Sequence, residues 1–294
     1  YDPVARVADM EANHVEASLC FPNYPRFCGQ LFSEVEDRTL GRLCIEAYND
    51  FMIDEWCGDS AGRLIPLCVV PLWDPQLAAA EVRRNAARGC RAVAFSELPS
   101  WLGLPSIHTR HWDPFFQACE ETSTVLAMHI GSGTKTVTTS PDAPTVVAAN
   151  LIACNSVASM VDWLFSGVFD RFPGIQLLYA ESQIGWIPYF VERADDTWQT
   201  HQWAQGEERS QRPPSDYYRE HISACFFKDT VGIDLLDRIG EDNVLFETDY
   251  PHQDGTFPRS KQVAEELFGH LPQPTINKIA RGNAIKLLGL DFEP

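Results

Sequence analysis

Short apolar runs alternate with longer amphipathic stretches along the whole chain. Seven of these runs are rich in β-branched, aromatic or leucine side chains and are bounded by turn residues, which is typical of strands. They occupy residues 16–22, 64–71, 92–96, 125–131, 175–182, 222–227 and 244–249. The run at 64–71, LIPLCVVP, is apolar nearly throughout, as expected for a parallel strand that is covered on both faces.

Each predicted strand is followed by a stretch that is predicted to be helical. These predicted helices cover residues 33–56, 75–88, 111–122, 144–172, 185–203, 231–239 and, as a pair of helices, 258–288. Regular alternation of strand and helix favours a parallel sheet with helices outside it, either open and doubly wound or closed into a barrel. The sequence contains neither GxGxxG nor GxxxxGK[ST], so a nucleotide-binding doubly wound fold is not expected.

A closed (β/α)8 barrel, the TIM barrel, needs eight strands, one more than the sequence displays. The opening segment, YDPVARVADMEANHVEASLCFP, has the pattern of a helix that enters a strand. We therefore predict that residues 1–294 form a single barrel domain whose first strand precedes residue 1.

The charge balance limits the classes of partner. Forty-one Asp and Glu residues stand against twenty-three Lys and Arg residues, which gives a formal net charge of −18. An acidic surface repels phosphate backbones and anionic lipids, so we expect neither nucleic-acid nor membrane binding. No apolar run reaches ~18 residues, so no membrane-spanning helix is expected. The nine cysteines form no CxxC pair, which favours free thiols in a cytoplasmic protein.

Polar side chains occur where several of the predicted strands end. His129, Glu181 and Asp249 each close a different apolar run, and His252 follows three residues after Asp249. Because the carboxyl ends of parallel strands meet at one rim of a barrel, we expect these side chains to lie near one another. Imidazole and carboxylate groups together can bind zinc, manganese or iron.

Each of these residues also has a purely structural interpretation. His129 and His252 could simply hydrogen-bond their surroundings, Glu181 could pair with a basic neighbour, and Asp249 could cap the following turn. His108, in the polar loop before the predicted helix at 111–122, is a weaker candidate for the site. The coincidence of several polar strand ends carries more weight than any single residue.

Several segments resemble the amidohydrolase-related metal-dependent hydrolases, in the branch of the amidohydrolase superfamily that includes aminocarboxymuconate-semialdehyde decarboxylase and the resorcylate-type decarboxylases. The most specific segments are FETDYPH at 246–252 and RGNA with LGL near the end of the chain, and MHIGSG at 128–133 adds to them. The resemblance extends over nearly the whole chain. It implies a (β/α)8 barrel that holds one divalent metal ion, zinc by default with manganese or iron as alternatives.

The resemblance also implies roles for individual residues. His129 corresponds to the metal ligand of strand 5 and Asp249 to the metal ligand of strand 8. Asp249 would also carry a proton, with Glu181 and His252 as partner acid or base. The decarboxylases have a histidine near the end of strand 6 where this chain has Ser182, directly after Glu181. The acidic-x-His ligand pair of strand 1 is absent from the 294 residues, and a homodimer is expected.

Three functions are compatible with these features. The first is a metal-dependent decarboxylase that acts on a small aromatic or ring-cleavage carboxylic acid. The second is a metal-dependent hydrolase of an ester, amide or C–C bond in a small molecule, and the third is a non-catalytic barrel that has lost its metal site. Aromatic residues near predicted loops are compatible with a pocket for a flat aromatic acid, although each could instead serve packing; they are Trp73, Trp101, Trp112, Trp186 and Phe257.

Overall fold

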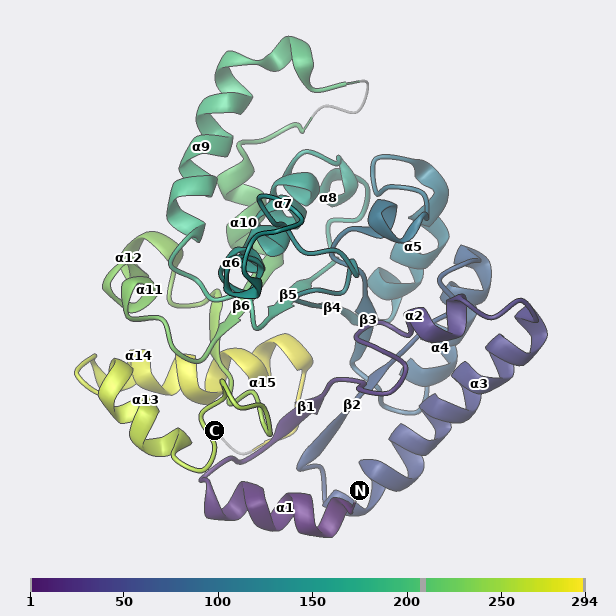
Figure 1. Cartoon of the computed structure of the whole chain (residues 1–294), viewed down its shortest axis with the longest axis vertical. Coiled ribbons are helices and arrows are strands. Elements are labelled where there is room, and N and C mark those ends of the chain that lie inside the picture. The colour runs from purple at the N-terminus through teal and green to yellow at the C-terminus, as the bar shows by residue number, and fades with distance from the viewer. Residues whose placement is uncertain (1, 207–209, 293–294) are drawn as a thin grey trace.

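The computed structural model describes residues 2–206 and 210–292 as a parallel sheet with helices arranged around it (Figure 1). The seven strands are hydrogen-bonded in sequence order, and all six neighbouring pairs are parallel. Every strand lies inside a run that the sequence predicts to be a strand. They are β1 (Ser18–Cys20), β2 (Leu64–Cys68), β3 (Ala92–Phe95), β4 (Val125–His129), β5 (Leu177–Ala180), β6 (Ile222–Phe226) and β7 (Val244–Phe246).

Burial along the sheet explains why the central strands are easy to recognise from sequence. All residues of β3, β4, β5 and β6 are buried, whereas β1 is only partly buried. Central parallel strands have helices on both faces and therefore lack polar alternation. β1 and β7 are the edges of the sheet, and no ladder joins them among the described residues. The α/β fold with a parallel sheet of seven strands is thus confirmed.

The helices largely follow the predicted stretches but are divided more finely. The predicted helix at 33–56 is α3 and a π-helix, with α2 ending at its first residue, and the stretch at 144–172 is α6, α7 and α8. The α-helices are α1 (Pro3–Ala12), α2 (Gln30–Ser33), α3 (Arg38–Phe51), α4 (Pro75–Ala86), α5 (Asp113–Glu121), α6 (Thr145–Leu151), α7 (Ala153–Leu164), α8 (Val168–Arg171), α9 (Ile187–Thr200), α10 (Pro214–His221), α11 (Thr230–Asp234), α12 (Leu236–Ile239), α13 (Ser260–Phe268), α14 (Gln273–Asn277) and α15 (Asn283–Leu288). Shorter π- and 3₁₀-helical turns are η1 (Met52–Trp56), η2 (Gly58–Ser60), η3 (Pro99–Leu102), η4 (Arg110–Trp112), η5 (Gln202–Ala204) and η6 (Lys278–Gly282).

Asp-Pro pairs start two of these helices. Asp2 and Asp74 are the N-caps of α1 and α4, and each side chain accepts hydrogen bonds from two backbone N–H groups of the first turn. The proline that follows lacks an N–H and has a backbone angle already suited to the first helical position. The first turn of each helix is therefore specified by the local sequence.

Contacts between distant parts of the chain bring its two ends to the β1 side of the sheet. The Asn13 amide donates to the Ser260 hydroxyl (2.6 Å), and Glu16 pairs with Arg281 (2.5 Å). Figure 1 shows α1 and the C-terminal helices on this side of the molecule. Helices at both ends of the chain thus flank the open edges of the sheet.

One helical segment, Thr145–Leu164, is long and apolar enough by length and composition alone to cross a membrane, with 22% of the tested window buried. The sequence analysis did not expect such a segment. Core helices of globular proteins share this composition, and the α7 part buries Ser156, Ser159, Met160 and Trp163. The Ser159 hydroxyl also lies 2.9 Å from the Tyr179 hydroxyl of β5. We therefore interpret α7 as a helix of the protein core.

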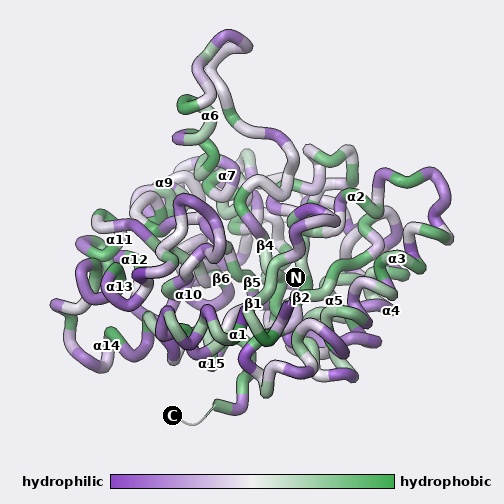
Figure 2. The backbone as a smooth tube through the Cα atoms, turned by 60° about the horizontal axis from the view of Figure 1, so that its bottom comes forward, coloured by the Kyte–Doolittle hydropathy of each residue, from purple (hydrophilic) through white to green (hydrophobic). Residues whose placement is uncertain are grey.

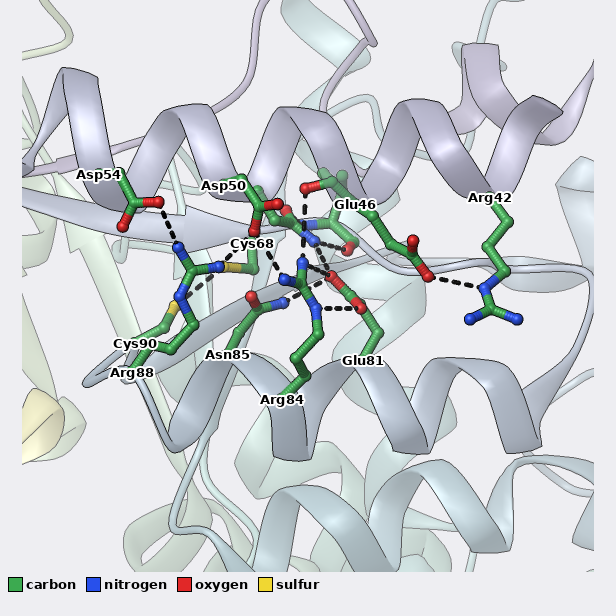
Figure 3. A network of polar contacts seen from close by, with 12 residues as sticks. Arg42, Glu46, Asp50, Asp54, Cys68, Glu81, Arg84, Asn85, Arg88 and Cys90 are labelled. Carbon is green, nitrogen blue, oxygen red and sulfur yellow. Dashed lines mark hydrogen bonds and ion pairs between the residues drawn. The ribbon is translucent and has the colours of Figure 1, made fainter. Parts of the chain in front are cut away.

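A polar network joins α3 to α4 beside β2 (Figure 3). Arg84 of α4 pairs with Asp50 of α3 and with Glu81 one turn earlier. Asn49, fully buried, accepts from the Val69 N–H (2.9 Å) and donates to the Val69 carbonyl (2.9 Å) and to Glu81 (2.7 Å). The Asn49 amide therefore replaces a strand partner for the backbone just beyond β2.

The Asn49 contacts predict a stability effect. Asn49→Leu keeps the approximate volume but leaves the buried Val69 N–H and carbonyl without partners, which should lower the free energy of unfolding by about 2–4 kcal/mol. Arg42→Ala is the control, because Arg42 forms an exposed ion pair with Glu46 one turn away and its loss should cost below about 0.5 kcal/mol. Urea unfolding followed by circular dichroism measures both. An equal loss of free energy of unfolding in the two variants would contradict a stabilising role of the Asn49 contacts.

Candidate functional site

His129 is the last residue of β4 and lies beside Ala180 of β5 in the sheet register. Its Nδ1 is 2.7 Å from the Ile130 carbonyl oxygen. Because a carbonyl only accepts hydrogen bonds, Nδ1 carries a proton and Nε2 is the atom directed at the neighbouring strand. Phe27 stacks on the imidazole with ring centroids 3.9 Å apart, and Phe21 meets it edge-on at 5.1 Å. The ring is thus held at a fixed tilt, with one nitrogen available.

Glu181 lies at the centre of the predicted group of residues. It directly follows β5, and its Oε1 is 2.7 Å from the Nε2 of His129. Its carboxyl is also hydrogen-bonded to that of Asp249. The Nδ1 of His252 is 2.6 Å from Asp249 Oδ1 and 3.9 Å from Glu181 Oε1. The structure therefore brings His129, Glu181, Asp249 and His252 together in one connected cluster.

The geometry differs from the sequence expectation in one respect. Among the described residues, one ligand atom each from Glu181, Asp249 and His252 lies within 4.8 Å of the others, a spacing that could hold a metal ion. His129 is not a member of that group of three, and it reaches Asp249 only through Glu181. The imidazole and the carboxylate expected to share an ion are thus bridged by a second carboxylate.

Crowding of acidic groups sets the charge of the site. Burial and the nearby Glu181 raise the pKa of Asp249 to about 6. Burial and the charge of Glu181 also raise the pKa of Glu247 well above its usual range, and Glu247 accepts a hydrogen bond from the Glu181 N–H (2.8 Å). Like charges at contact distance disfavour one another's ionised forms. Two of the three carboxyls therefore hold on to protons more strongly than an exposed acid would.

The His129–Glu181 pair shows the opposite balance. Burial acts to lower the pKa of His129, but the hydrogen bond and the charge of Glu181 outweigh it, so the pKa is raised. Burial likewise acts to raise the pKa of Glu181, but His129 outweighs it and the pKa is lowered. The geometry agrees with this balance, because Nδ1 of His129 faces a carbonyl oxygen and Nε2 faces a carboxylate oxygen, so each ring nitrogen has an acceptor beside it.

Backbone strain coincides with the two acidic residues of the cluster. Glu181 has φ +58° and Asp249 has φ +49°, both in the left-handed region that side chains other than glycine seldom adopt. The loop after Asp249 returns to the end of β7, where the Thr256 N–H donates to the Thr248 carbonyl (2.9 Å). A Cβ on Gly255 would lie 2.3 Å from the Asp249 carbonyl oxygen, so only glycine fits there. Strain of this kind concentrates at functional sites.

Other residues considered in the sequence lie outside the cluster. Ser182 is fully buried and donates to the Gln183 carbonyl (3.0 Å), so its hydroxyl serves the backbone. His108 lies 2.5 Å from Asp162, and Trp112 is buried in the core. The Trp186 indole donates to the Ser182 carbonyl (2.8 Å). Glu181 thus lies in the cluster, whereas its neighbour Ser182 does not.

Three neighbours of the cluster were given no role by sequence reasoning. Glu247 directly follows β7, so its place at the end of a strand could be predicted from the sequence. The strand pattern alone does not tell whether Glu247 or Asp249 faces the site. Phe21 and Phe27 follow β1, at the other side of the sheet from β7. Their contact with His129 depends on the curvature of the sheet, which no local pattern encodes.

Comparison with known proteins assigns the family. The profile of the amidohydrolase family matches residues 2–290, and the chain belongs to this family. It is 24% identical to a gamma-resorcylate decarboxylase of Rhizobium sp. (strain MTP-10005), over 97% of this chain and 86% of that protein. It is 26% identical to a gamma-resorcylate decarboxylase of Rhodococcus jostii (strain RHA1), over 97% and 87%.

Solved structures share the fold. A 5-carboxyvanillate decarboxylase of Novosphingobium aromaticivorans with bound manganese and 3-methoxy-4-hydroxy-5-nitrobenzoic acid superimposes with a TM-score of 0.79 and 20% identity, covering 97% of this chain and 80% of that one. A dihydroxybenzoic acid decarboxylase of Polaromonas sp. JS666 with manganese and 2-nitroresorcinol has a TM-score of 0.76 and 20% identity, covering 98% and 86%. The likeness supports the barrel-type α/β architecture.

The left-handed backbone at Asp249 predicts an order of stabilities. Asp249→Asn and Asp249→Ala both remove the charge, but asparagine tolerates positive φ while alanine loses about 1 kcal/mol there. We therefore expect the metal-free alanine variant to be about 1 kcal/mol less stable than the asparagine variant in urea unfolding. Asp254 is the control, since it is exposed and is not among the positive-φ residues. The alanine and asparagine variants of Asp254 should be equally stable. If the two variants differ in free energy of unfolding by the same amount at both positions, backbone strain at Asp249 is not the cause.

Proposed function

We propose that this protein is a metal-dependent decarboxylase that acts on a small aromatic carboxylic acid. The observation that carries the proposal is the cluster in which Glu181 connects His129 to Asp249 at the carboxyl edge of the parallel sheet. The names of the relatives add support, because they are decarboxylases of hydroxybenzoic acids, and their solved structures hold manganese beside aromatic analogues. The family membership extends over the same residues.

We infer that His129 and Asp249 bind the metal ion, with Glu181 as an additional ligand. The donor set fits a divalent cation, because an imidazole nitrogen and several carboxylate oxygens suit zinc, manganese and iron. Glu181 lies beside His129, with its Oε1 2.7 Å from the Nε2 of the imidazole. Zinc is the default that the family resemblance implies, and manganese is the ion in the similar structures. Both belong in the first experiments.

The cluster can provide the proton that decarboxylation consumes. A bound divalent ion would withdraw electron density from the carboxylate and adjacent hydroxyl of the substrate. The C–C bond to the carboxylate breaks, carbon dioxide leaves, and the electron pair stays on the ring carbon, which then takes a proton. Asp249 is the donor that we propose, with Glu181 and His252 as its partner acid or base. His252, with 56% of its side chain exposed and Nδ1 2.6 Å from Asp249, would return a proton from solvent.

We also propose that the sheet is completed to a single (β/α)8 barrel domain by an eighth strand between β7 and β1. Both neighbours have edges without a strand partner among the described residues, and a barrel has no free edge. By the family resemblance, this strand would bring the acidic-x-His pair. Metal affinity rises with the number of ligands, so such a pair would strengthen binding of the ion.

We propose that the protein is a homodimer and that it is cytoplasmic. Figure 2 shows α6 standing away from the rest of the molecule. Residues 144–161 contain no charged side chain, and Val146 is 62% exposed. Two copies with a formal charge of −18 repel each other over most of their surface, so a neutral apolar segment is the favourable place for contact.

The cytoplasmic location is proposed from the cysteines. All nine cysteines are free thiols, which suits a reducing compartment.

The decarboxylase proposal predicts a metal-dependent release of carbon dioxide. A panel of hydroxybenzoic acids is incubated with the protein plus manganese or zinc, and headspace carbon dioxide is measured. Asp249→Asn should lower kcat/KM by about 10²–10⁴-fold, the usual contribution of a general acid. A chelator should abolish turnover, and adding manganese or zinc should restore it.

Asp254→Asn is the matched control, since this exposed carboxylate lies in the same loop and pairs with Lys228. It should leave kcat/KM unchanged. Full activity in the Asp249→Asn variant would refute the mechanism. Hydrolysis of esters or amides without carbon dioxide release would replace the decarboxylase with the hydrolase.

The dimer proposal predicts an effect of charge on α6. Val146→Asp should shift the mass measured by light scattering from dimer toward monomer, because it places a buried charge at the contact. Val231→Asp is the control, since Val231 of α11 is equally exposed at 60% but lies on another helix. A monomeric wild-type protein, or a Val146→Asp variant that remains dimeric, would refute this interface.

A further inference from the structure

Glu97 is a buried acid outside the cluster to which no role has been assigned. It lies two residues beyond β3, between that strand and the turn that follows His129, and is 1% exposed. An acidic side chain is almost never buried so completely without partners that require it. Its partners therefore indicate what it does.

The contacts of Glu97 converge on the turn after His129. Its Oε2 accepts a hydrogen bond from the Gly131 N–H (2.9 Å), and its own N–H donates to the Ser132 hydroxyl (2.9 Å). The Ser132 N–H in turn donates to the His129 carbonyl (3.0 Å). Glu97 thus binds the two residues that fix how the chain leaves β4, directly beside the imidazole.

The same group of residues reaches the aromatic ring that covers the imidazole. The Ser132 carbonyl accepts from the Gln30 side chain (2.8 Å), and Gln30 accepts from the Cys28 N–H (2.8 Å). Cys28 is adjacent to Phe27, which stacks on His129. Gln30 and Ser132 are both at most 3% exposed. The turn held by Glu97 is therefore also hydrogen-bonded to the loop that carries Phe27.

The second carboxyl oxygen of Glu97 is used as well. Its Oε1 accepts from the Ser156 hydroxyl of α7 (2.5 Å), and Ser156 is fully buried. Burial raises the pKa of Glu97 to about 7, against the lowering effect of the Ser156 hydrogen bond. Both protonation states satisfy the contacts: the carboxylate accepts twice, while the acid donates to the Ser156 oxygen and still accepts from Gly131.

We propose that Glu97 is a positioning residue that, through the turn at Gly131 and Ser132, holds the Nε2 of His129 in the direction needed to bind the metal ion. This inference rests on the proposed metal site. Hydrogen bonds that orient a ligand from behind typically contribute 10–100-fold to metal affinity. The imidazole hydrogen-bonds the Ile130 carbonyl within this turn, so the turn that Glu97 holds contributes to the orientation of the ring together with Phe21 and Phe27.

The chemistry of the contacts selects two informative variants. Glu97→Gln can keep both interactions, with its amide oxygen accepting from Gly131 and its amide NH₂ donating to the Ser156 oxygen. Glu97→Met has a similar volume but cannot accept the Gly131 hydrogen bond. Glu81→Met is the control for general destabilisation, since Glu81 is also buried, at 5% exposed, and accepts from Asn49 and Asn85 in the network between α3 and α4.

Binding of manganese, followed by the electron paramagnetic resonance signal of the free ion, is measured for the full chain and its variants. We expect Glu97→Gln to bind within about 3-fold of wild type and Glu97→Met to bind about 10–100-fold more weakly. Glu81→Met should keep wild-type affinity although it unfolds more easily. A Glu97→Met variant with wild-type affinity would overturn the inference, as would an equal loss in Glu81→Met.

A metal-free measurement separates this inference from the proposed function. Amide exchange at Gly131 and the ring nitrogen signals of His129, both by NMR, should change in Glu97→Met and not in Glu97→Gln. If the wild type binds manganese but releases no carbon dioxide, the decarboxylase proposal fails, and the affinities of the Glu97 variants still decide the positioning role. Unchanged Gly131 and His129 signals in Glu97→Met would refute that role whatever the activity.

Discussion

The interaction on which the site depends is the crowding of carboxyl groups around Glu181. Its side chain contacts Asp249 and His129, and its backbone N–H donates to Glu247. Acids at this spacing are tolerated only when protons or a cation offset their mutual repulsion. Consistent with this, the pKa values of Asp249, Glu247 and His129 are all raised. The left-handed backbone at Glu181 and Asp249 brings these acids together.

Much of the architecture could be predicted because its signals are local. An apolar run such as LIPLCVVP identifies a strand that is covered on both faces, and Asp74 followed by Pro75 identifies the start of α4. The rule that parallel strands end at a common edge was sufficient to bring His129, Glu181 and Asp249 together in advance. The roles of these residues, in contrast, came from resemblance to a family.

The remainder depends on contacts between residues far apart in sequence. Glu97 contacts Gly131 and Ser156, and Phe27 reaches His129, although no periodicity links these positions. The predicted helix at 33–56 is also divided, into α3 and a π-helix. That Glu181 stands between the two expected ligands became visible only when the curvature of the sheet was known. The turn that follows a strand decides the direction of the side chain at the strand end. Residues that follow other strands hold that turn in place, as Glu97 does for the turn after His129.

The shortness of the two outer strands has a consequence for handling the protein. β1 and β7 are three residues long, so each free edge offers few backbone groups to a strand from another molecule. Long, flat edges promote ordered aggregation, whereas short ones resist it. Helices at both ends of the chain stand beside these edges and further limit access. The outer strands of the described sheet therefore offer little backbone for ordered pairing with another molecule.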